Sequence, residues 1–227
     1  MSKYIIASVI VLVLFLLFAI LVSPKVNFNS INNNSLIIKA DSSAFLNINN
    51  SHSQALNQLM IALTKYGREV FWPMAIILLF LLGGWTGKKT AIVIAFSMLV
   101  LIPLGVLTKD VIARPRPSIP KSDFLIPADS EYAYPSGHAL IVSAGAAVAI
   151  MMFTGTQKRR VVSLALAVEA ALVCLSRVYV GGHYPLDLIG GILLGVGVSL
   201  FFVGIEKHIE SVMILVRKKK KTLRLKQ

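Results

Sequence analysis

Long apolar stretches separated by short polar segments dominate the sequence. Six of them approach the length of about 20 residues that a helix needs to cross a bilayer, namely Tyr4–Val22, Val70–Trp85, Thr90–Leu107, Ala139–Phe153, Val161–Ser176 and Leu188–Ile205. We predict helices, because backbone in lipid must satisfy its own hydrogen bonds. The fourth and fifth are short and are expected to extend into the polar motifs beside them. The expected fold is an all-α membrane protein, with a bundle of six transmembrane helices in a single domain over residues 1–227.

The N-terminal third leaves several alternatives open. The first apolar stretch is longer than the roughly 7–15 apolar residues of a signal peptide, so a retained anchor is favoured. Residues 27–50 are rich in Asn and Ser, with Asn-x-Ser sequons at Asn33 and Asn49, and are expected to form an exposed polar connection. Chance sequons are common in such sequence, so glycosylation stays open. From Ser51 to Gly67, apolar residues at helical spacing predict a short amphipathic helix, either at the membrane interface or packed on the loop.

Composition agrees with a membrane protein. The chain has 227 residues, of which 56% are hydrophobic and 15% charged, and its mean hydropathy is +0.76; a soluble domain is less apolar. A net charge of +13 would suit nucleic acid. The basic residues, however, lie between apolar stretches and in the tail 207–227, as membrane topology requires, so we exclude nucleic acid as a partner. The single cysteine, Cys174, excludes a disulfide within the chain.

The distribution of lysine and arginine predicts the orientation. With six spans both termini share a side, which collects fourteen of the 23 basic residues and leaves nine on the other. Positive charge favours the cytoplasmic side. We therefore expect a multi-pass protein of the cell membrane with both termini in the cytoplasm. The basic tail is expected to anchor the last span, and it can also attract anionic membrane lipids.

Three polar motifs lie between the apolar stretches on the expected outer face. They are Lys109-(x6)-Arg116-Pro117, Pro135-Ser136-Gly137-His138 and Ser176-Arg177-(x5)-His183-(x3)-Asp187. Phosphoryl transfer spreads negative charge over oxygens, and its catalysis consists mostly of positioning and electrostatic stabilisation. Three cations, Lys109, Arg116 and Arg177, suit that charge. A helix beginning at Ser136-Gly137 would add backbone N–H groups and a hydroxyl.

The two motif histidines differ in their neighbours. His183 has Asp187 four residues later, and a carboxylate on one ring nitrogen makes the other a better nucleophile. This pattern predicts His183 as a nucleophile that forms a phosphohistidine. His138 has no such neighbour and suits the general acid that protonates the leaving oxygen and later activates water.

Each residue also has an ordinary interpretation. A loop histidine is usually solvated, Arg-Pro is usually a turn, and both Ser136 and Asp187 suit helix N-caps. Three such motifs in one membrane protein favour the chemical interpretation. Asp129 and Glu131 are read as a solvated loop, so no metal site is expected. Glu169, within the fifth stretch, either faces the bundle or lies at its edge, and it stays outside the predicted site.

Together the three motifs resemble those of the type 2 phosphatidic acid phosphatase superfamily, in its membrane-bound lipid phosphatase branch. With the span layout, the resemblance reaches from about residue 46 to 206. It implies a six-helix bundle that dephosphorylates lipid phosphates or diphosphates without a metal or cofactor. For the matching positions it implies phosphate binding by Lys109, Arg116, Ser136, Gly137 and Arg177, acid catalysis by His138, and a nucleophile pair of His183 and Asp187. Arg114 lies outside the strict pattern, as a rim cation or with no role.

The leading hypothesis is an outward-facing phosphatase of a lipid phosphate, with a polyprenyl diphosphate favoured as substrate because the chain is small. Phosphatidic acid or phosphatidylglycerol phosphate is the alternative substrate. A non-catalytic lipid-binding scaffold is the alternative of another class, and the intact histidines argue against it. A transporter is disfavoured, because its charged groups would be distributed along the spans, whereas those of this chain cluster at one face. Neither the lipid nor the oligomeric state follows from the sequence.

Overall fold

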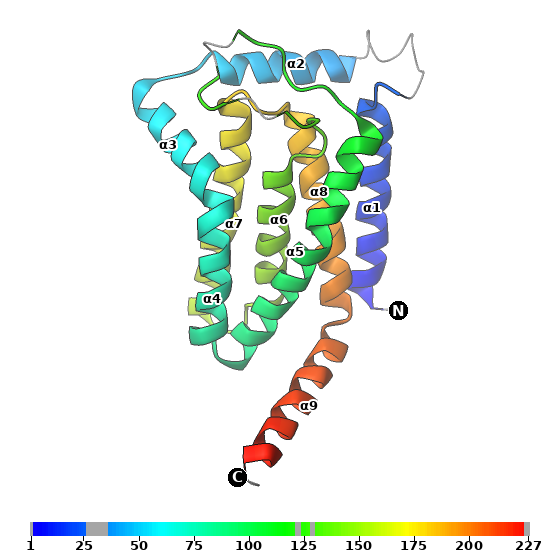
Figure 1. Cartoon of the computed structure of the whole chain (residues 1–227), viewed down its shortest axis with the longest axis vertical. Coiled ribbons are helices and arrows are strands. Elements are labelled where there is room, and N and C mark those ends of the chain that lie inside the picture. Colours follow the sequence, from blue (N-terminus) through cyan, green and yellow to red (C-terminus); the bar gives the residue numbers. More distant parts are fainter. Residues whose placement is uncertain (1, 26–35, 121–123, 128–129, 225–227) are drawn as a thin grey trace.

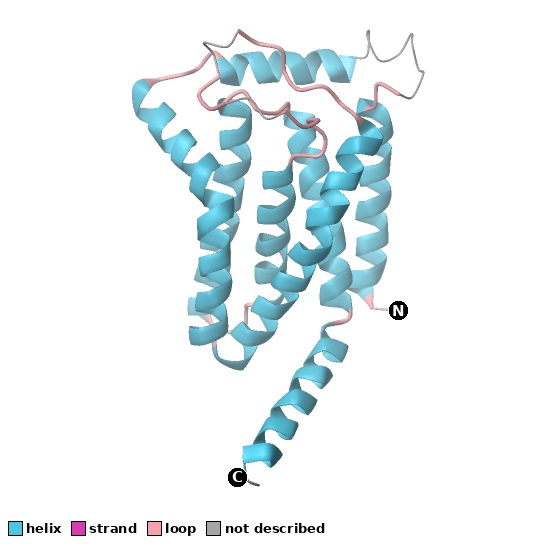
Figure 2. Ribbon diagram, viewed as in Figure 1, coloured by secondary structure: helices cyan, strands magenta, loops and turns pink. Residues whose placement is uncertain are grey.

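The structure is a computed structural model, which describes residues 2–25, 36–120, 124–127 and 130–224, the side chains of 220–224 excepted. This described part is helical and contains no strand (Figure 2). Its elements are α1 Lys3–Val22, α2 Leu36–Asn49, α3 Gln54–Tyr66, the π-helical turn η1 Gly67–Phe71, α4 Trp72–Leu82, α5 Gly84–Ile112, α6 Gly137–Met152, α7 Gln157–Tyr179, α8 Pro185–Gly204 and α9 Glu206–Arg224. The expected all-α class is confirmed.

Helices α1 and α4 to α8 run alongside one another as a bundle (Figure 1). Helix α2 lies across one end, together with the segment that joins α5 to α6, and we call this the loop end. Both termini lie toward the opposite end, where α9 extends from the bundle, and we call this the terminal end. Segments far apart in sequence therefore meet at the loop end.

Four helices of the described chain are long and apolar enough to cross a membrane, namely α1, α5, α7 and α8. Many of their outward side chains are large and apolar, as at Leu17, Leu99 and Leu164, which is typical of a surface that faces lipid. The other two expected spans are shorter, with 11 residues in α4 and 16 in α6. As expected, α6 and α7 extend into the motifs beside them.

Helix α6 lies inside the bundle, and glycines let α8 approach it closely. A Cβ atom added at Gly191 would lie 2.6 Å from the carbonyl oxygen of Ser136, and one at Gly195 would overlap the carbonyl oxygen of Leu140. Gly190 likewise faces the ring of Tyr134, just before α6. This close contact fixes the start of α6 against the start of α8.

The expectation of an exposed connection over residues 27–50 was wrong for the part that the structure describes. Residues 36–49 form α2, in which Asp41, Phe45 and Asn49 are buried. The Nδ2 atom of Asn49 donates to the carbonyl oxygen of Tyr179 at 3.2 Å. These partners lie far away in sequence, so local composition gave no sign of them. The other sequon, at Asn33, lies outside the described residues.

A helix does form over the segment with helical spacing, as α3, and it continues through η1 into α4. Its Thr64 hydroxyl bonds the Ser176 hydroxyl of α7 at 2.8 Å. The basic tail is also helical, as α9, and its Glu210 carboxylate accepts from Trp85 Nε1 at 2.8 Å and from Lys89 Nζ at 3.0 Å. These contacts join α9 to the start of α5.

Candidate active site

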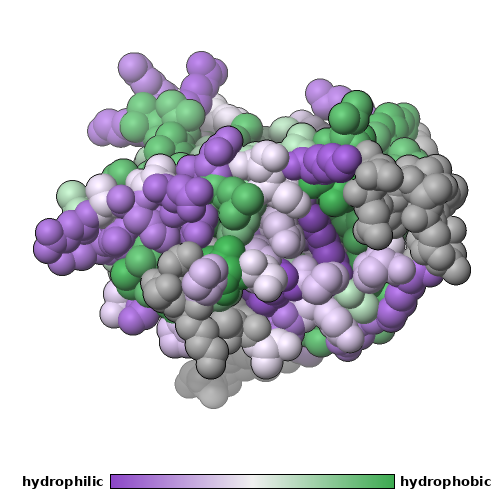
Figure 3. Space-filling model, turned by 90° about the horizontal axis from the view of Figure 1, so that it is seen from above, coloured by the Kyte–Doolittle hydropathy of each residue, from purple (hydrophilic) through white to green (hydrophobic). Residues whose placement is uncertain are grey.

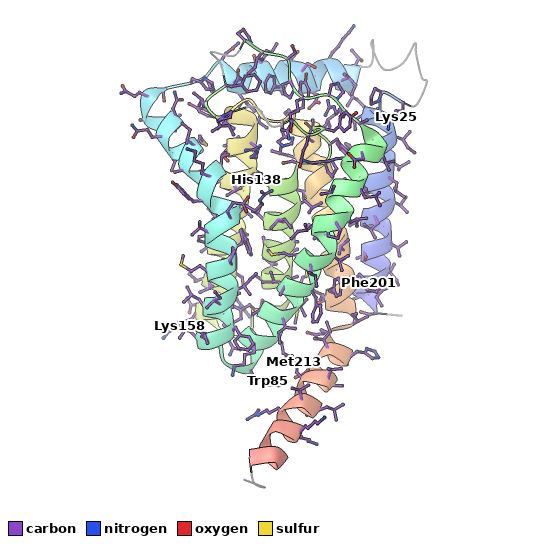
Figure 4. The ribbon with its side chains drawn as sticks, in the orientation of Figure 1. Lys25, Trp85, His138, Lys158, Phe201 and Met213 are labelled. Atoms are coloured by element: carbon purple, nitrogen blue, oxygen red, sulfur yellow. The ribbon has the colours of Figure 1, made fainter. Side chains whose placement is uncertain are left out.

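A cavity of about 410 Å³ opens at the loop end of the bundle, and its lining is mostly polar and charged. Figure 4 shows His138 in this half of the bundle, and Figure 3 shows the loop end from above, with many hydrophilic residues on it. The cavity is lined by Arg68, Lys109, Arg116, Ser130, Glu131, Gly137, His138, Arg177 and His183. Six of the eight residues singled out by sequence therefore lie together. The other two, Ser136 and Asp187, are fully buried and do not line it.

The end of α5 directs the first motif into the cavity. Lys109 lies in the last turn, and Ala113 then adopts a left-handed conformation with φ of 56°, which turns the chain back. The prolines that follow keep the segment extended. The Arg116 guanidinium donates to the carbonyl oxygens of Glu131 and Gly182, at 2.7 Å each, so it joins two loops.

The start of α6 carries the second motif. The first intrahelical bond runs from Leu140 N to the Ser136 oxygen, at 3.0 Å, so the N–H groups of Gly137 and His138 belong to the open first turn. The Ser136 N–H, by contrast, donates to the carbonyl oxygen of Asp187 at 2.9 Å. The Ser136 Oγ is buried and has no hydrogen-bond partner among the described residues. Ser136 thus connects α6 with α8 behind the cavity wall.

The end of α7 and the start of α8 carry the third motif. Arg177 lies in the last turn of α7 and is 2% exposed. Gly181, with φ of 90°, then turns the chain, and the His183 N–H donates to the Arg177 carbonyl oxygen at 3.2 Å. A Cβ atom at Gly182 would lie 3.1 Å from Arg177 Nη2. The turn therefore places His183 next to Arg177.

The His183 ring lies between an arginine and a carboxylate. Its Nε2 accepts from Arg116 Nη1 at 3.3 Å, and its Nδ1 lies 3.6 Å from Asp187 Oδ2. Since arginine only donates, Nε2 carries the lone pair and Nδ1 the proton. Asp187 is held in turn, because its Oδ2 accepts from the Tyr184 N–H at 2.8 Å in the first turn of α8. The ring thus presents its unprotonated nitrogen on the side of the cavity cations.

Three cavity residues were missed as site residues, namely Arg68, Ser130 and Glu131. Arg68 projects from the π-helical turn η1, and the guanidinium lies 3.3 Å from the Cβ position of Gly137. No motif marks it, although π-helical turns are frequent at functional sites. Glu131 was read as part of a solvated loop; it is exposed, but it also pairs with Lys109 and lines the cavity. Asp129, read as part of the same loop, lies outside the described residues.

A pair of residues behind the cavity was also missed. Arg114, expected at the rim or without a role, is 6% exposed and bonds both Asp187 and Asp41 of α2. Burial raises the pKa of the Asp41 carboxyl, although the Arg114 charge acts in the opposite direction. The repeat Arg-Pro-Arg-Pro was the only local sign of Arg114. Nothing local pointed to Asp41.

His138 and Glu169 are both tied to neighbouring helices. His138 Nε2 donates to the Thr64 carbonyl oxygen of α3 at 3.0 Å. Glu169 faces the bundle, where its Oε2 accepts from Trp72 Nε1 of α4 at 2.9 Å. Among the described residues, no three His, Cys, Asp or Glu side chains gather where they could hold a metal ion.

Comparison with known proteins settles the family. A family model, the PAP2 superfamily, matches residues 90–209, which is more than half of the chain and includes all three motifs. The chain belongs to the PAP2 superfamily. The resemblance noted from the motifs is therefore confirmed. All the residues that line the cavity, except Arg68, belong to the matched region 90–209.

Proteins similar to this chain include several phosphatases. The chain is 41% identical over 162 residues to an undecaprenyl-diphosphatase of Sulfolobus acidocaldarius, covering 70% of this chain and 75% of that protein. It is 30% identical over 167 residues to phosphatidylglycerophosphatase B of Bacillus subtilis, covering 68% and 77%. The crystal structure of a transmembrane PAP2 type phosphatidylglycerolphosphate phosphatase from Bacillus subtilis has the same fold, with a TM-score of 0.66, 24% identity, and coverage of 89% and 96%.

Proposed function

We propose that this chain is a membrane phosphatase that hydrolyses a polyprenyl diphosphate through a phosphohistidine. The observation that carries the proposal is the cavity, where two histidines and four cations converge from four separate segments. Membership of the PAP2 superfamily and the 41% identity to an undecaprenyl-diphosphatase support the substrate class.

In the first half-reaction, His183 Nε2 attacks phosphorus, and the bond from phosphorus to the leaving oxygen breaks. Asp187, whose Oδ2 lies 3.6 Å from Nδ1, balances the positive charge that develops on the ring. His138 gives a proton to the leaving oxygen. Its Nε2 is occupied by the Thr64 carbonyl oxygen, so Nδ1 is the nitrogen assigned to this transfer. In the second half-reaction His138 takes a proton from water, which attacks the phosphohistidine and releases phosphate.

Four cations meet the charge of the substrate in this proposal. Lys109, Arg116 and Arg177 belong to the motifs, and Arg68 of η1 lines the same cavity. Arg68 pairs with Glu69 and Lys109 pairs with Glu131, and both carboxylates are exposed, so phosphate oxygens can replace them. A diphosphate carries more negative charge than a monophosphate, and a fourth arginine or lysine suits that difference. Ser136 acts by joining α6 to α8, behind the groups that touch phosphate.

Purified protein is expected to release phosphate from polyprenyl diphosphate faster than from the corresponding monophosphate, phosphatidic acid or phosphatidylglycerol phosphate. Because the charge on phosphate is met by protein cations, the rate should be unchanged in excess EDTA. Orthovanadate, which mimics five-coordinate phosphorus, should inhibit. A malachite green assay over this panel measures all three expectations.

The other outcomes of the panel are equally specific. A preference for phosphatidic acid or phosphatidylglycerol phosphate would replace the substrate and keep the reaction. A loss of activity in EDTA that magnesium restores would contradict the proposed use of protein cations. No release from any member of the panel would favour a lipid-binding scaffold.

We further propose that residues 1–227 form one integral domain with six spans, α1 and α4 to α8. The short α4 is extended by the π-helical turn, and α6 is enclosed by its neighbours, so neither needs the full length of a lipid-facing helix. Helix α3, with exposed Leu56, Leu59 and Tyr66, lies at the interface before the second span in this proposal. The excess of basic residues at the terminal end supports a cytoplasmic location for both termini and the tail, with the cavity outside.

Two lysine positions at opposite ends of the bundle test this orientation. Lys25 and Lys158 are both exposed, at the loop end and the terminal end respectively (Figure 4). In a Cys174→Ala background, Lys25→Cys should react with an impermeant maleimide added to intact cells. Lys158→Cys should react only after the cells are opened. Labelling of Lys158→Cys in intact cells, with Lys25→Cys protected, would invert the topology.

A further inference from the structure

We propose that Asp41 and Arg114 are positioning residues, which hold the Asp187 carboxylate in the orientation that His183 needs. The proposal rests on the proposed phosphatase function and adds to its site a residue from α2. Residue 41 lies outside the family region 90–209. Neither Asp41 nor Arg114 is a position of the three motifs.

The three side chains form a buried chain of charges. Arg114 Nη1 donates to Asp187 Oδ1 and Nη2 donates to Asp41 Oδ2, both at 2.5 Å. The exposed fractions of Asp41, Arg114 and Asp187 are 5%, 6% and 0%. Burying a single charge costs several kcal/mol unless it is paired. The planar guanidinium satisfies both carboxylates at once, which a lysine ammonium cannot do with the same geometry.

Arg114 restricts how the Asp187 carboxylate can turn. Oδ1 is held by Arg114, while Oδ2 accepts from the Tyr184 N–H at 2.8 Å and lies 3.6 Å from His183 Nδ1. Oδ1 therefore binds Arg114, while Oδ2 is the oxygen that faces the histidine. The separation of 3.6 Å is longer than a hydrogen bond, and catalytic contacts of this kind often tighten when substrate binds.

Asp41 fixes Arg114 and the start of α8 together. Its Oδ1 accepts from the Leu186 N–H at 2.8 Å, in the first turn of α8. A carboxylate at this position also interacts favourably with the helix dipole. The Arg114 guanidinium also makes a cation–π contact with Tyr184, since it lies over that ring, 4.5 Å from the ring centre. Helix α2 thus holds the helix turn that carries Asp187.

Asp41 also determines the net charge behind the nucleophile. A pair of Arg114 and Asp187 alone would be neutral, and the positive charge that forms on His183 would face no net negative charge. With both carboxylates ionised, the form that their contacts with Arg114 favour, the three side chains carry a net charge of −1. Fixed charge aimed at the place where the opposite charge develops is the main electrostatic contribution to catalysis. Arg114 offsets the negative charge of Asp187, and Asp41 in turn offsets the positive charge of Arg114.

Two conservative variants test this arrangement. Asp41→Asn keeps the shape and removes the charge, and Arg114→Lys keeps the charge and removes the planar fork. We expect each to lower kcat by about tenfold or more and to change KM less than about threefold, because the cavity cations remain in place. Formation of phosphoenzyme from nitrophenyl phosphate, which needs little help from His138, should slow by the same factor. The double variant should be little worse than the poorer single variant, since residues that act as a unit are not additive.

Matched controls separate positioning from stability. Glu169→Gln changes another carboxylate, which is half-buried and bonds Trp72, and Arg159→Gln changes an arginine of α7 at the terminal end that bonds Thr86. Both should keep kcat even where the melting temperature falls. Full kcat in folded Asp41→Asn and Arg114→Lys would overturn this proposal alone. A lack of turnover in the unchanged chain would overturn the proposed function, and this proposal with it.

Discussion

The variant His183→Ala is expected to lose both turnover and any trapped phosphoenzyme, since it has no nucleophile. His138→Ala should lose about 10²–10⁴-fold in turnover, the usual contribution of a general acid. A substrate with an activated leaving group, such as nitrophenyl phosphate, needs little protonation. It should therefore restore phosphoenzyme formation in His138→Ala and not in His183→Ala. Quenched-flow trapping of labelled phosphoenzyme distinguishes the two variants.

The control for this prediction is Asp187→Asn, which keeps the imidazole and removes the orienting charge, so its loss should be intermediate. Rescue of His183→Ala alone would exchange the two roles and leave the phosphatase reaction standing. The geometry favours His183 as the nucleophile, because its Nδ1 faces the Asp187 carboxylate, which leaves the lone pair on Nε2 and balances the charge that attack creates on the ring. The ring of His138 instead bonds a neutral carbonyl oxygen, which gives it no orienting negative charge.

The largest expected effect on stability comes from a glycine in α8. A Cβ atom at Gly195 would overlap the backbone oxygen of Leu140 in α6, and backbone cannot move aside as a flexible side chain can. Gly195→Val should therefore separate α6 from α8 and lower the free energy of unfolding by about 3 kcal/mol or more. Activity should fall with it, because α6 begins at the residue before His138 and α8 carries Asp187. Thermal unfolding in detergent measures the shift.

Gly105→Ala in α5 is the matched control. A Cβ atom there would lie 3.6 Å from a Leu140 side-chain carbon, an ordinary contact, and the residue is helical. This variant should be neutral or slightly stabilising, because alanine costs less conformational entropy in a helix than glycine. Equal melting temperatures for Gly195→Val and the unchanged chain would contradict the close packing of α6 and α8.

The apolar pattern alone predicted where the helices of the bundle lie, because the requirement of the bilayer acts on each segment separately. Helices α1 and α8 coincide with the first and last predicted spans within three residues at each end. The three motifs likewise predicted a common site, because a phosphate needs several cations and a nucleophile at one place. The cavity joins Lys109, His138 and His183 as expected.

The pattern failed where a segment is shaped by distant partners. Helix α2 is held by the contacts of Asp41 with Arg114 and with Leu186, which lie 73 and 145 residues away along the chain. Its polar composition resembled a loop because polar residues within it are satisfied by the rest of the protein. Ser136 is fully buried and does not line the cavity, and its backbone N–H bonds the Asp187 carbonyl oxygen of α8.

The sequence by itself therefore determined the helical class, the membrane setting and the set of residues that we propose to transfer a phosphoryl group. Each of these follows from residue type, from spacing along one segment, or from hydropathy. Only the tertiary structure decided that Arg68 joins the cavity, that Ser136 stays behind it, and that Asp41 and Arg114 surround Asp187. The physical reason is that burial and charge pairing depend on which segments lie next to one another in space. The packing of helices decides this, and it involves contacts between segments that are far apart in the sequence.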